Sequence, residues 1–250
     1  MRSDEISLPK IALPEYTVQL QSVKTPVRFR PYVVKEEKIF LIAKESNDVA
    51  DMERAVRQVL KNCTFGAVDI DALPSFDLEY LFLQIRAKSV NNVVELKYRC
   101  QKFTDDTNTS RCGTINTVSI PLDTIQVFVD PTHKTTMQLN TDLHVELQYP
   151  TIETVANVLQ SGKPLEEQPI ELLSRVIKTI VQADGTVFET KDYTTAELVE
   201  FVESLSLPQI EQIQTFFTTM PKLTYDTEFV CEKCGHREPL HFEGIADFFD

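Results

Sequence analysis

The chain has 250 residues, with 25 Lys and Arg side chains against 38 Asp and Glu side chains and a formal net charge of -13 at pH 7. Its six glycines lie at least nine positions apart, which excludes the glycine-rich loops that cradle nucleotide phosphates. The acidic excess lies in residues 91–250, and such a surface disfavours nucleic acid and anionic lipid while keeping the protein soluble or meeting a basic partner.

The first 90 residues are predicted to form an extended arm followed by helices. Prolines interrupt residues 1–32 four times, so this segment cannot form a long helix and is expected to lie along a surface. Helical spacing of apolar residues then predicts helices over residues 34–45, 48–62 and 76–88, with Asn47 and Ser75 as caps of the second and third. Cys63 extends the apolar stripe of the second helix, which indicates a buried thiol.

A strand-like alternation begins at Asn91. Four segments show this alternation, counting the one that begins at Asn91, so residues 91–150 are predicted to form an antiparallel sheet of about five strands. Helical spacing returns in residues 151–159, 170–182, 195–204 and 208–218, and Asp184-Gly185 marks a tight turn. A last strand-like segment runs from Thr224 to Phe242.

These elements predict an α+β fold in which N-terminal helices, a central antiparallel sheet and C-terminal helices form one interlocked unit. The expected regions are residues 1–90, an extended arm plus helices; residues 91–150, the sheet with a first cysteine hairpin; and residues 151–250, a helical region with a second cysteine hairpin. No hydrophobic run approaches the ~18 residues of a membrane span, and the first residues lack a signal-peptide core. We therefore expect a cytoplasmic chain, in which disulfides are rare.

Four of the five cysteines are spaced as ligands of a structural zinc ion. Cys231 and Cys234 are two residues apart and precede Gly235, whose backbone permits the tight turn by which two thiolates hold one ion. Cys100 and Cys112 adjoin strand-like segments, and Cys112 also precedes a glycine. Because a tetrahedral site needs four ligands, we predict a discontinuous zinc ribbon that contributes on the order of 10 kcal/mol to folding.

The first cysteine pair departs from the usual spacing. Eleven residues separate Cys100 from Cys112, where two to four are usual. These residues are polar and rich in turn formers, so they can extend from the hairpin tip without displacing the ligands. Two alternatives remain open: His236 or His241 replaces a cysteine that cannot reach the ion, or packing alone holds four neighbouring cysteines.

No catalytic motif accompanies the cysteines. His133 and His144 have acidic neighbours but no Ser-His-Asp pattern and no HExxH motif. We therefore expect no catalytic residues. At the C-terminus, Phe248 and Phe249 either pack back against the chain or remain available to a partner.

Three blocks of sequence resemble the baseplate hub proteins of T-even-type contractile-tailed bacteriophages, a family that includes hub assembly factors. The blocks are FRPYVVKEEKIFLIAKES at residues 29–46, FDLEYLFLQIRAKSV at residues 76–90 and CEKCGHREPLHFEGIADFF at residues 231–249. Most of the chain is covered, with residues 120–225 matching only in general character. The resemblance implies a non-enzymatic protein needed to build the baseplate hub, either as a hub constituent or as an assembly factor.

The partners implied are other hub or tail proteins, met in the host cytoplasm during assembly or in the tail baseplate of the particle. The segment FRPYVVKEEK has alternating charge around aromatic anchors, which suits an interface. The candidate contact residues are Phe29, Arg30, Tyr32, Lys35, Glu36, Glu37, Phe248 and Phe249. Two other classes remain as alternatives: a metal-dependent enzyme, and a zinc-ribbon module that binds nucleic acid, although acidic residues outnumber basic ones around the last cysteine pair.

Overall fold

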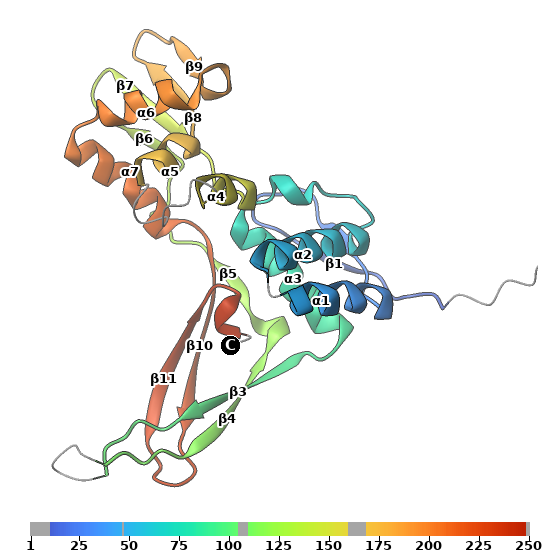
Figure 1. The fold of residues 1–250 in the computed structure, drawn as a ribbon. Helices are drawn as coiled ribbons and strands as arrows, with labels where there is room; N and C mark the ends of the chain where they lie inside the picture. Colours follow the sequence, from blue (N-terminus) through green and yellow to red (C-terminus); the bar gives the residue numbers. More distant parts are fainter. Residues whose placement is uncertain (1–10, 47, 105–109, 160–168, 249–250) are drawn as a thin grey trace, which may run out of the picture.

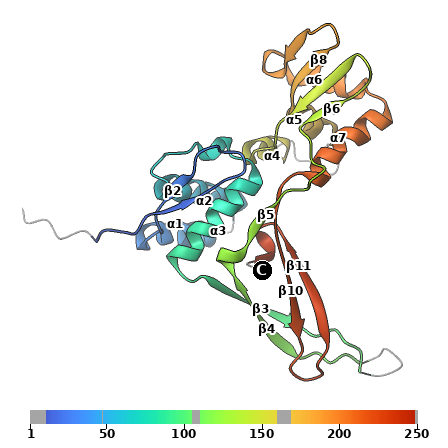
Figure 2. The same cartoon turned by 180° about the vertical axis from the view of Figure 1, so that it is seen from behind.

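The structure, a computed structural model, describes residues 11–46, 48–104, 110–159 and 169–248. These residues form helices and antiparallel sheets, which confirms the predicted α+β class. Figure 1 shows three parts: a helical body from the N-terminal third, a smaller lobe of sheet and helices at the top, and a stalk of two hairpins pointing downward. Seen from behind in Figure 2, the body and the lobe still lie apart, with α4 (Ile152–Leu159) between them.

The helical body holds α1 (Val34–Ser46), α2 (Val49–Cys63) and α3 (Ser75–Ser89) beside a short antiparallel hairpin of β1 (Tyr16–Val18) and β2 (Val27–Phe29). Each helix begins and ends within one residue of its predicted bounds. The apolar residues of the helices meet in a common core, which explains why their spacing is enough to locate them.

The N-terminal ends of α2 and α3 differ in detail from the prediction. Asp48 caps α2, because its Oδ1 accepts a 2.8 Å hydrogen bond from the backbone N–H of Ala50. The predicted cap, Asn47, lies outside the described residues. Ser75, the predicted cap of α3, is instead its first helical residue, and Pro74 precedes it without a side-chain capping bond.

Residues 16–32 of the N-terminal segment are built into the body, which corrects the expectation of an arm lying along a surface for this part of it. Its apolar side chains alternate and pack into the same core as α2 and α3. The buried members are Val18, Leu20, Val27, Phe29 and Tyr32. Asp77 of α3 is fully buried, and its carboxylate accepts hydrogen bonds of 2.8 and 2.7 Å from the backbone N–H groups of Gln21 and Ser22. The prolines exclude a helix here but do not keep the chain outside the core.

Asp77→Ala is expected to lower the free energy of unfolding by about 2 kcal/mol, because two backbone N–H groups lose a charged acceptor in a buried place. Urea denaturation of the full chain measures this loss. The matched control is Asp192→Ala in the exposed surface of the lobe, which is expected to change stability by less than about 0.5 kcal/mol. Equal effects of the two substitutions would contradict the anchoring role of Asp77.

The lobe is a four-stranded antiparallel sheet with helices packed against it. The strand order is β6 (Thr136–Gln138), β7 (Leu143–Leu147), β8 (Ile177–Gln182) and β9 (Val187–Glu189). The helices are α5 (Pro169–Val176), α6 (Thr195–Glu203) and α7 (Leu207–Thr219). Buried residues of the sheet, including Val145 and Ile177, share one core with Val202 of α6 and Phe216 of α7.

The helix predicted for residues 170–182 is wrong in its second half. The helix α5 ends at Val176, and the chain continues at once as strand β8, which pairs with β7 and β9. The strand reads IKTIVQ, and its β-branched residues suit a half-buried sheet. The tight turn predicted at Asp184-Gly185 is confirmed, since it joins β8 to β9 and Gly185 has a φ of +89°.

The stalk consists of two hairpins, β3 (Val93–Arg99) with β4 (Ile115–Pro121) and β10 (Lys222–Val230) with β11 (Arg237–Glu243). At its base, β5 (Gln126–Phe128) adds to the free edge of β10. The single sheet predicted for residues 91–150 is therefore wrong, because its strands fall into three sheets. Alternation identifies a strand without identifying its partner, and here β5 and β7 pair with strands from the second half of the chain.

Candidate metal centre

The two hairpins of the stalk pack face to face through apolar side chains. The ring of Tyr98 on β3 lies 6.4 Å from that of Phe229 on β10 and 6.3 Å from that of Phe242 on β11, measured between centroids. Leu96 and Val118 are buried in the same cluster. Because side chains alternate across each strand, this apolar inner face fixes the register and brings the two hairpin tips together.

Four cysteines meet at the joined tips. The Sγ atoms of Cys100 and Cys234 are 3.7 Å apart, those of Cys112 and Cys231 are 3.8 Å apart, and all four lie within 4.8 Å of one another. A tetrahedral site with Zn–S bonds of about 2.3 Å places its sulfur atoms about 3.8 Å apart. The distances between the four Sγ atoms therefore fit one tetrahedral ion, and the structure brings together all four predicted ligands.

The second cysteine pair forms a tight knuckle. The backbone N–H of Cys231 donates to the carbonyl of His236 at 2.8 Å, and the N–H of Gly235 donates back to the carbonyl of Cys231 at 2.9 Å. Gly235 has a φ of +67°, in the left-handed region that favours glycine. The turn therefore aims both thiols of the pair at the same point.

The first pair forms the same knuckle. The N–H of Cys100 donates to the carbonyl of Thr114 at 2.9 Å, the N–H of Gly113 donates to the carbonyl of Cys100 at 3.1 Å, and Gly113 has a φ of +68°. The N–H of Cys112 donates to the carbonyl of Lys102 at 2.8 Å, so the chain leaves the knuckle after Lys102 and returns at Cys112. Without residues 103–111 the segment reads CQKCG, against CEKCG in the second knuckle.

Deleting residues 103–111 is expected to leave a functional knuckle, because Lys102 and Cys112 already lie within hydrogen-bonding distance of each other. The variant that lacks residues 103–111 should retain about one metal ion per chain, because its two cysteines are then separated by two residues, as is usual for zinc knuckles. Elemental analysis of purified protein measures the metal content. Loss of the metal in a protein that remains folded would show that the long spacing is required for binding.

The pKa values of the thiols in the cluster differ from one another. Hydrogen bonds from the backbone N–H groups of Cys234 and Lys233 lower the pKa of Cys231 to about 6. Burial raises the pKa of Cys100 to about 12. The hydroxyl and backbone of Thr114 lower the pKa of Cys112. Since metal binding requires thiolates, a cation that enters this cluster releases the remaining protons.

Asn116 links the two knuckles and is a residue that the sequence analysis missed. Its side chain is only 4% exposed, its Oδ1 accepts a 3.0 Å hydrogen bond from the N–H of Glu232, and its Nδ2 donates to the carbonyl of Thr114 at 3.1 Å. The sequence could have indicated Asn116 by its position, because it alternates with the same period as Val118 and Ile120 and so points to the buried face of β4. A polar residue at an inward position generally has a specific partner.

The histidines near the cysteines are not needed as ligands, because the thiols complete the set. His241 lies on the outer face of the β10–β11 hairpin, where its Nδ1 is 2.6 Å from Oδ1 of Asp226.

His133 is far from the cysteines in its contacts. It stacks on Tyr149, with its Nε2 2.9 Å from the Tyr149 hydroxyl and its Nδ1 2.9 Å from the Thr219 hydroxyl. His133 therefore joins the chain below the lobe to the end of α7.

The hydrogen bond with Asp226 raises the pKa of His241 above its ordinary value of about 6.5. The stabilisation by this pair is fully present below the unfolded pKa and is lost as the pH rises through the folded pKa. We expect the imidazole resonances of His241 to titrate at higher pH than in the Asp226→Asn variant, and NMR measures both. Identical titrations in the two proteins would contradict the pairing.

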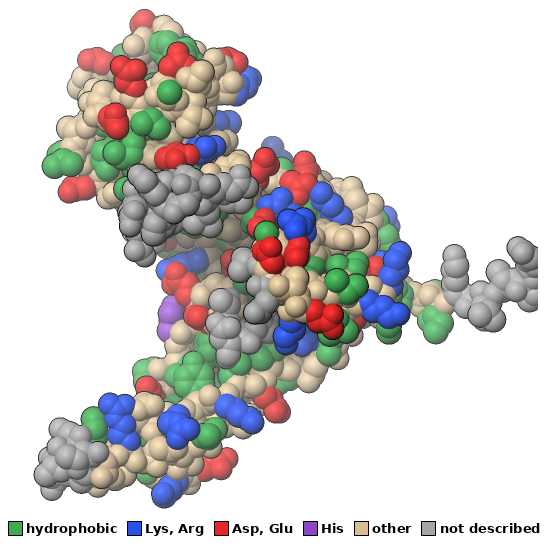
Figure 3. All heavy atoms as spheres, in the orientation of Figure 1, with side chains coloured by type: hydrophobic (Ala, Val, Ile, Leu, Met, Phe, Trp, Pro, Cys, Tyr) green, Lys and Arg blue, Asp and Glu red, His purple; other side chains and the backbone are tan. Residues whose placement is uncertain are grey.

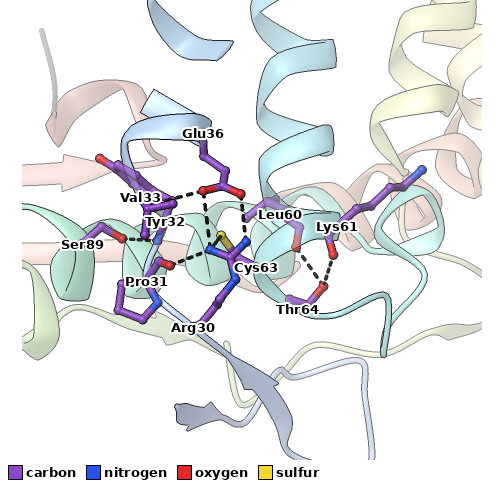
Figure 4. Close-up of polar contacts among 10 residues, drawn as sticks. All are labelled: Arg30, Pro31, Tyr32, Val33, Glu36, Leu60, Lys61, Cys63, Thr64 and Ser89. Atoms are coloured by element: carbon purple, nitrogen blue, oxygen red, sulfur yellow. Dashed lines mark hydrogen bonds and ion pairs between the residues drawn. The ribbon is translucent and has the colours of Figure 1, made fainter. Parts of the chain in front are cut away.

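The structure places the candidate contact residues mostly inside the chain, which corrects their reading as a surface. Phe29, Tyr32, Glu36 and Phe248 are buried. Arg30 is largely covered, and its guanidinium is 2.8 Å from the Glu36 carboxylate, as Figure 4 shows. Alternating charge around aromatic residues is also the pattern of a segment that contributes its aromatics and one ion pair to the core.

Of the remaining candidates, two are described and lie at or near the surface. Lys35 is exposed and Glu37 is half-buried on α1, whereas Phe249 lies outside the described residues. The ring of Phe248 stacks on that of Phe242 with centroids 5.6 Å apart. Of the two alternatives for this end of the chain, Phe248 therefore packs back against the stalk.

The fold and the site define a mixed helix and sheet protein in which two hairpins from distant parts of the chain form a four-cysteine cluster that could hold a metal ion. Residues 13–250 match the family model described as T4 bacteriophage base plate protein, and the chain belongs to that family. No curated protein and no solved structure gives a significant match. Among the described residues, no helix has the length and apolar character needed to cross a bilayer.

Proposed function

We propose that this protein builds the central hub of the phage baseplate through contacts with other tail proteins, as a hub constituent or an assembly factor, and that it is not an enzyme. The observation that carries the proposal is the family match, which spans the body, the stalk and the lobe. The donor set supports it, because four thiolates fill a tetrahedral site, whereas catalytic zinc sites keep one position open for water or substrate.

The metal proposed for this site is zinc with a structural role. Zinc favours four-coordinate thiolate sites of this size, and the two glycine knuckles supply the ligands in pairs. Near their tips, the described residues of the two hairpins are also joined by the stacking of Tyr98 on Phe229 and by the bond between Asn116 and the backbone of Glu232. Zinc would thus join the middle of the chain to its C-terminal region.

Quantitative mass spectrometry of purified phage particles and of infected-cell lysates tests the hub role. A fixed small number of copies per particle supports a hub constituent, and abundance in lysates with absence from particles supports an assembly factor. A phage in which this gene is deleted supplies the control, and we expect it to accumulate baseplates that lack a hub. Intact hubs in the deletion phage would overturn the proposal.

A further inference from the structure

An apolar cleft of about 400 Å³ opens in the lobe between the sheet and α6. This volume lies within the range of pockets that bind ligands or side chains. Its apolar lining consists of Leu143, Ile180, Phe188, Tyr193, Leu198 and Phe201. The rings of Phe188 and Tyr193 lie 6.4 Å apart, and Tyr193 is 42% exposed, so a large aromatic surface faces solvent at the mouth.

The mouth of this cleft is acidic. Glu197 lines the cleft itself, and the hydroxyl and backbone N–H of Thr194 donate to its Oε2 at 2.7 and 2.8 Å. These bonds lower the pKa of Glu197, so it stays charged at neutral pH. Asp142 and Asp192 are exposed and directly precede the lining residues Leu143 and Tyr193.

The acidity extends over the whole lobe. Residues 136–147 and 169–219, which hold the strands and helices of the lobe, contain ten acidic and three basic side chains. Two of the three basic side chains are already in ion pairs, Arg175 with Glu171 at 2.8 Å and Lys178 with Glu146 at 3.1 Å. Figure 3 shows acidic side chains spread over this lobe, at the top of the view, beside exposed apolar ones.

We propose that this cleft binds a basic amphipathic segment of another tail protein. One or two large apolar side chains of the segment enter the cleft, and flanking Lys or Arg residues pair with the acidic mouth. Burial of the apolar side chains supplies affinity, whereas the charge of the lobe speeds association and rejects acidic segments. The proposal rests on the proposed hub function, since it names the chemistry of one partner contact.

Fluorescence anisotropy with the full chain and three labelled peptides of about twelve residues tests the chemistry of the occupant. The first peptide is a Lys- and Leu-rich amphipathic helix, the second carries Glu in place of every Lys, and the third carries Ala in place of every Leu. We expect only the first to bind, with weaker binding as the salt rises from about 50 to about 300 mM. Equal binding of the first and third peptides, or binding of the second, would overturn the proposal.

Substitutions locate the binding to the cleft. Tyr193→Ala removes an aromatic ring that lines the cleft, and Glu197→Gln removes the charge of the lining carboxylate while keeping an acceptor for Thr194. Each is expected to weaken binding by about tenfold. The matched controls are Val187→Ala, on the opposite face of β9 from Phe188, and Glu211→Gln on α7. Neither residue lines the cleft. If the controls weaken binding as much as the test variants, the attraction belongs to the overall charge and the proposal fails.

Failure of the cleft proposal can be distinguished from failure of the proposed hub function. Phage that carry Tyr193→Ala should show a reduced yield of hub-containing baseplates, with normal levels of the folded variant in lysates. Normal baseplates from this phage, together with hub loss in the deletion phage, would overturn the cleft while the hub function stands. Intact hubs in the deletion phage would overturn the hub function whatever the peptides do.

Discussion

Removing the metal, or replacing Cys231 with serine, is expected to unfold the stalk. Structural zinc contributes on the order of 10 kcal/mol in small zinc-dependent folds, which is comparable with the whole stability of a typical domain of about 5–15 kcal/mol. The two hairpins belong to separate sheets, and in the described residues apolar contacts and the bond between Asn116 and Glu232 hold them together. A bound metal would add to these interactions. We therefore expect the loss of the metal to exceed the stabilisation that the packing of Tyr98 and its neighbours supplies.

Metal content and protease sensitivity of the purified full chain measure this effect. We expect about one zinc per chain in the native protein and none in the Cys231→Ser variant, whose stalk should become sensitive to protease. The chain supplies its own control, because Cys63 is a fully buried cysteine of α2 that is not part of the cluster. Cys63→Ala should keep the metal and lose only the packing of a small side chain and its 3.9 Å contact with the Arg30 guanidinium.

Two results would contradict the structural role. Native protein without metal that keeps a protease-resistant stalk would show that packing alone holds the four cysteines. A folded Cys231→Ser variant that lacks a hydrolytic activity present in the native protein would return the metal-dependent enzyme to consideration. The second result is not expected, because four thiolates leave no position for water.

The helices and the cluster of four cysteines are the features that the sequence predicts best. α2 carries its apolar stripe within fifteen consecutive residues, so local spacing locates it. The cysteines are accessible for a different reason: a thiolate pair with a glycine requires a second pair, and the chain holds one other candidate pair beside strands. The need for four metal ligands therefore predicts a contact between distant segments, which the spacing of apolar residues does not predict.

The sheets and the contact surface are less accessible because both depend on distant partners. Nothing in the residues of β5 indicates that β10, almost a hundred residues later, supplies its hydrogen bonds. Glu36 presents a similar ambiguity, since a charged residue in an amphipathic segment is exposed unless a partner compensates its burial. The partner is Arg30, and only the folded structure shows the Glu36 carboxylate turned inward to meet it (Figure 4).

Arg30→Met is expected to lower the free energy of unfolding by about 3 kcal/mol, because it leaves the Glu36 carboxylate buried without its cation. The Glu36 side chain is 2% exposed, and it also accepts a 3.0 Å hydrogen bond from the backbone N–H of Val33. The matched control is Arg28→Met, which removes an exposed pair with Glu15 and is expected to cost less than about 0.5 kcal/mol. Chemical denaturation measures both.

A second substitution separates the buried charge from the lost packing. Glu36→Gln keeps an acceptor for the Val33 N–H and removes the charge, so the double variant with Arg30→Met should recover more than half of the loss. Burial alone would raise the pKa of Glu36, but the bonds from Arg30 and Val33 outweigh it and lower the pKa.

The stabilisation from this pair is therefore present above the unfolded pKa of about 4.3 and is lost as the pH falls through the folded value. The difference in stability between the native protein and Arg30→Met should shrink as the pH falls, first as the buried Glu36 of the variant takes up a proton and then as Glu36 of the native protein does. A difference that stays constant down to pH values at which Glu36 is protonated, or no recovery in the double variant, would show that packing rather than charge holds Arg30 in place.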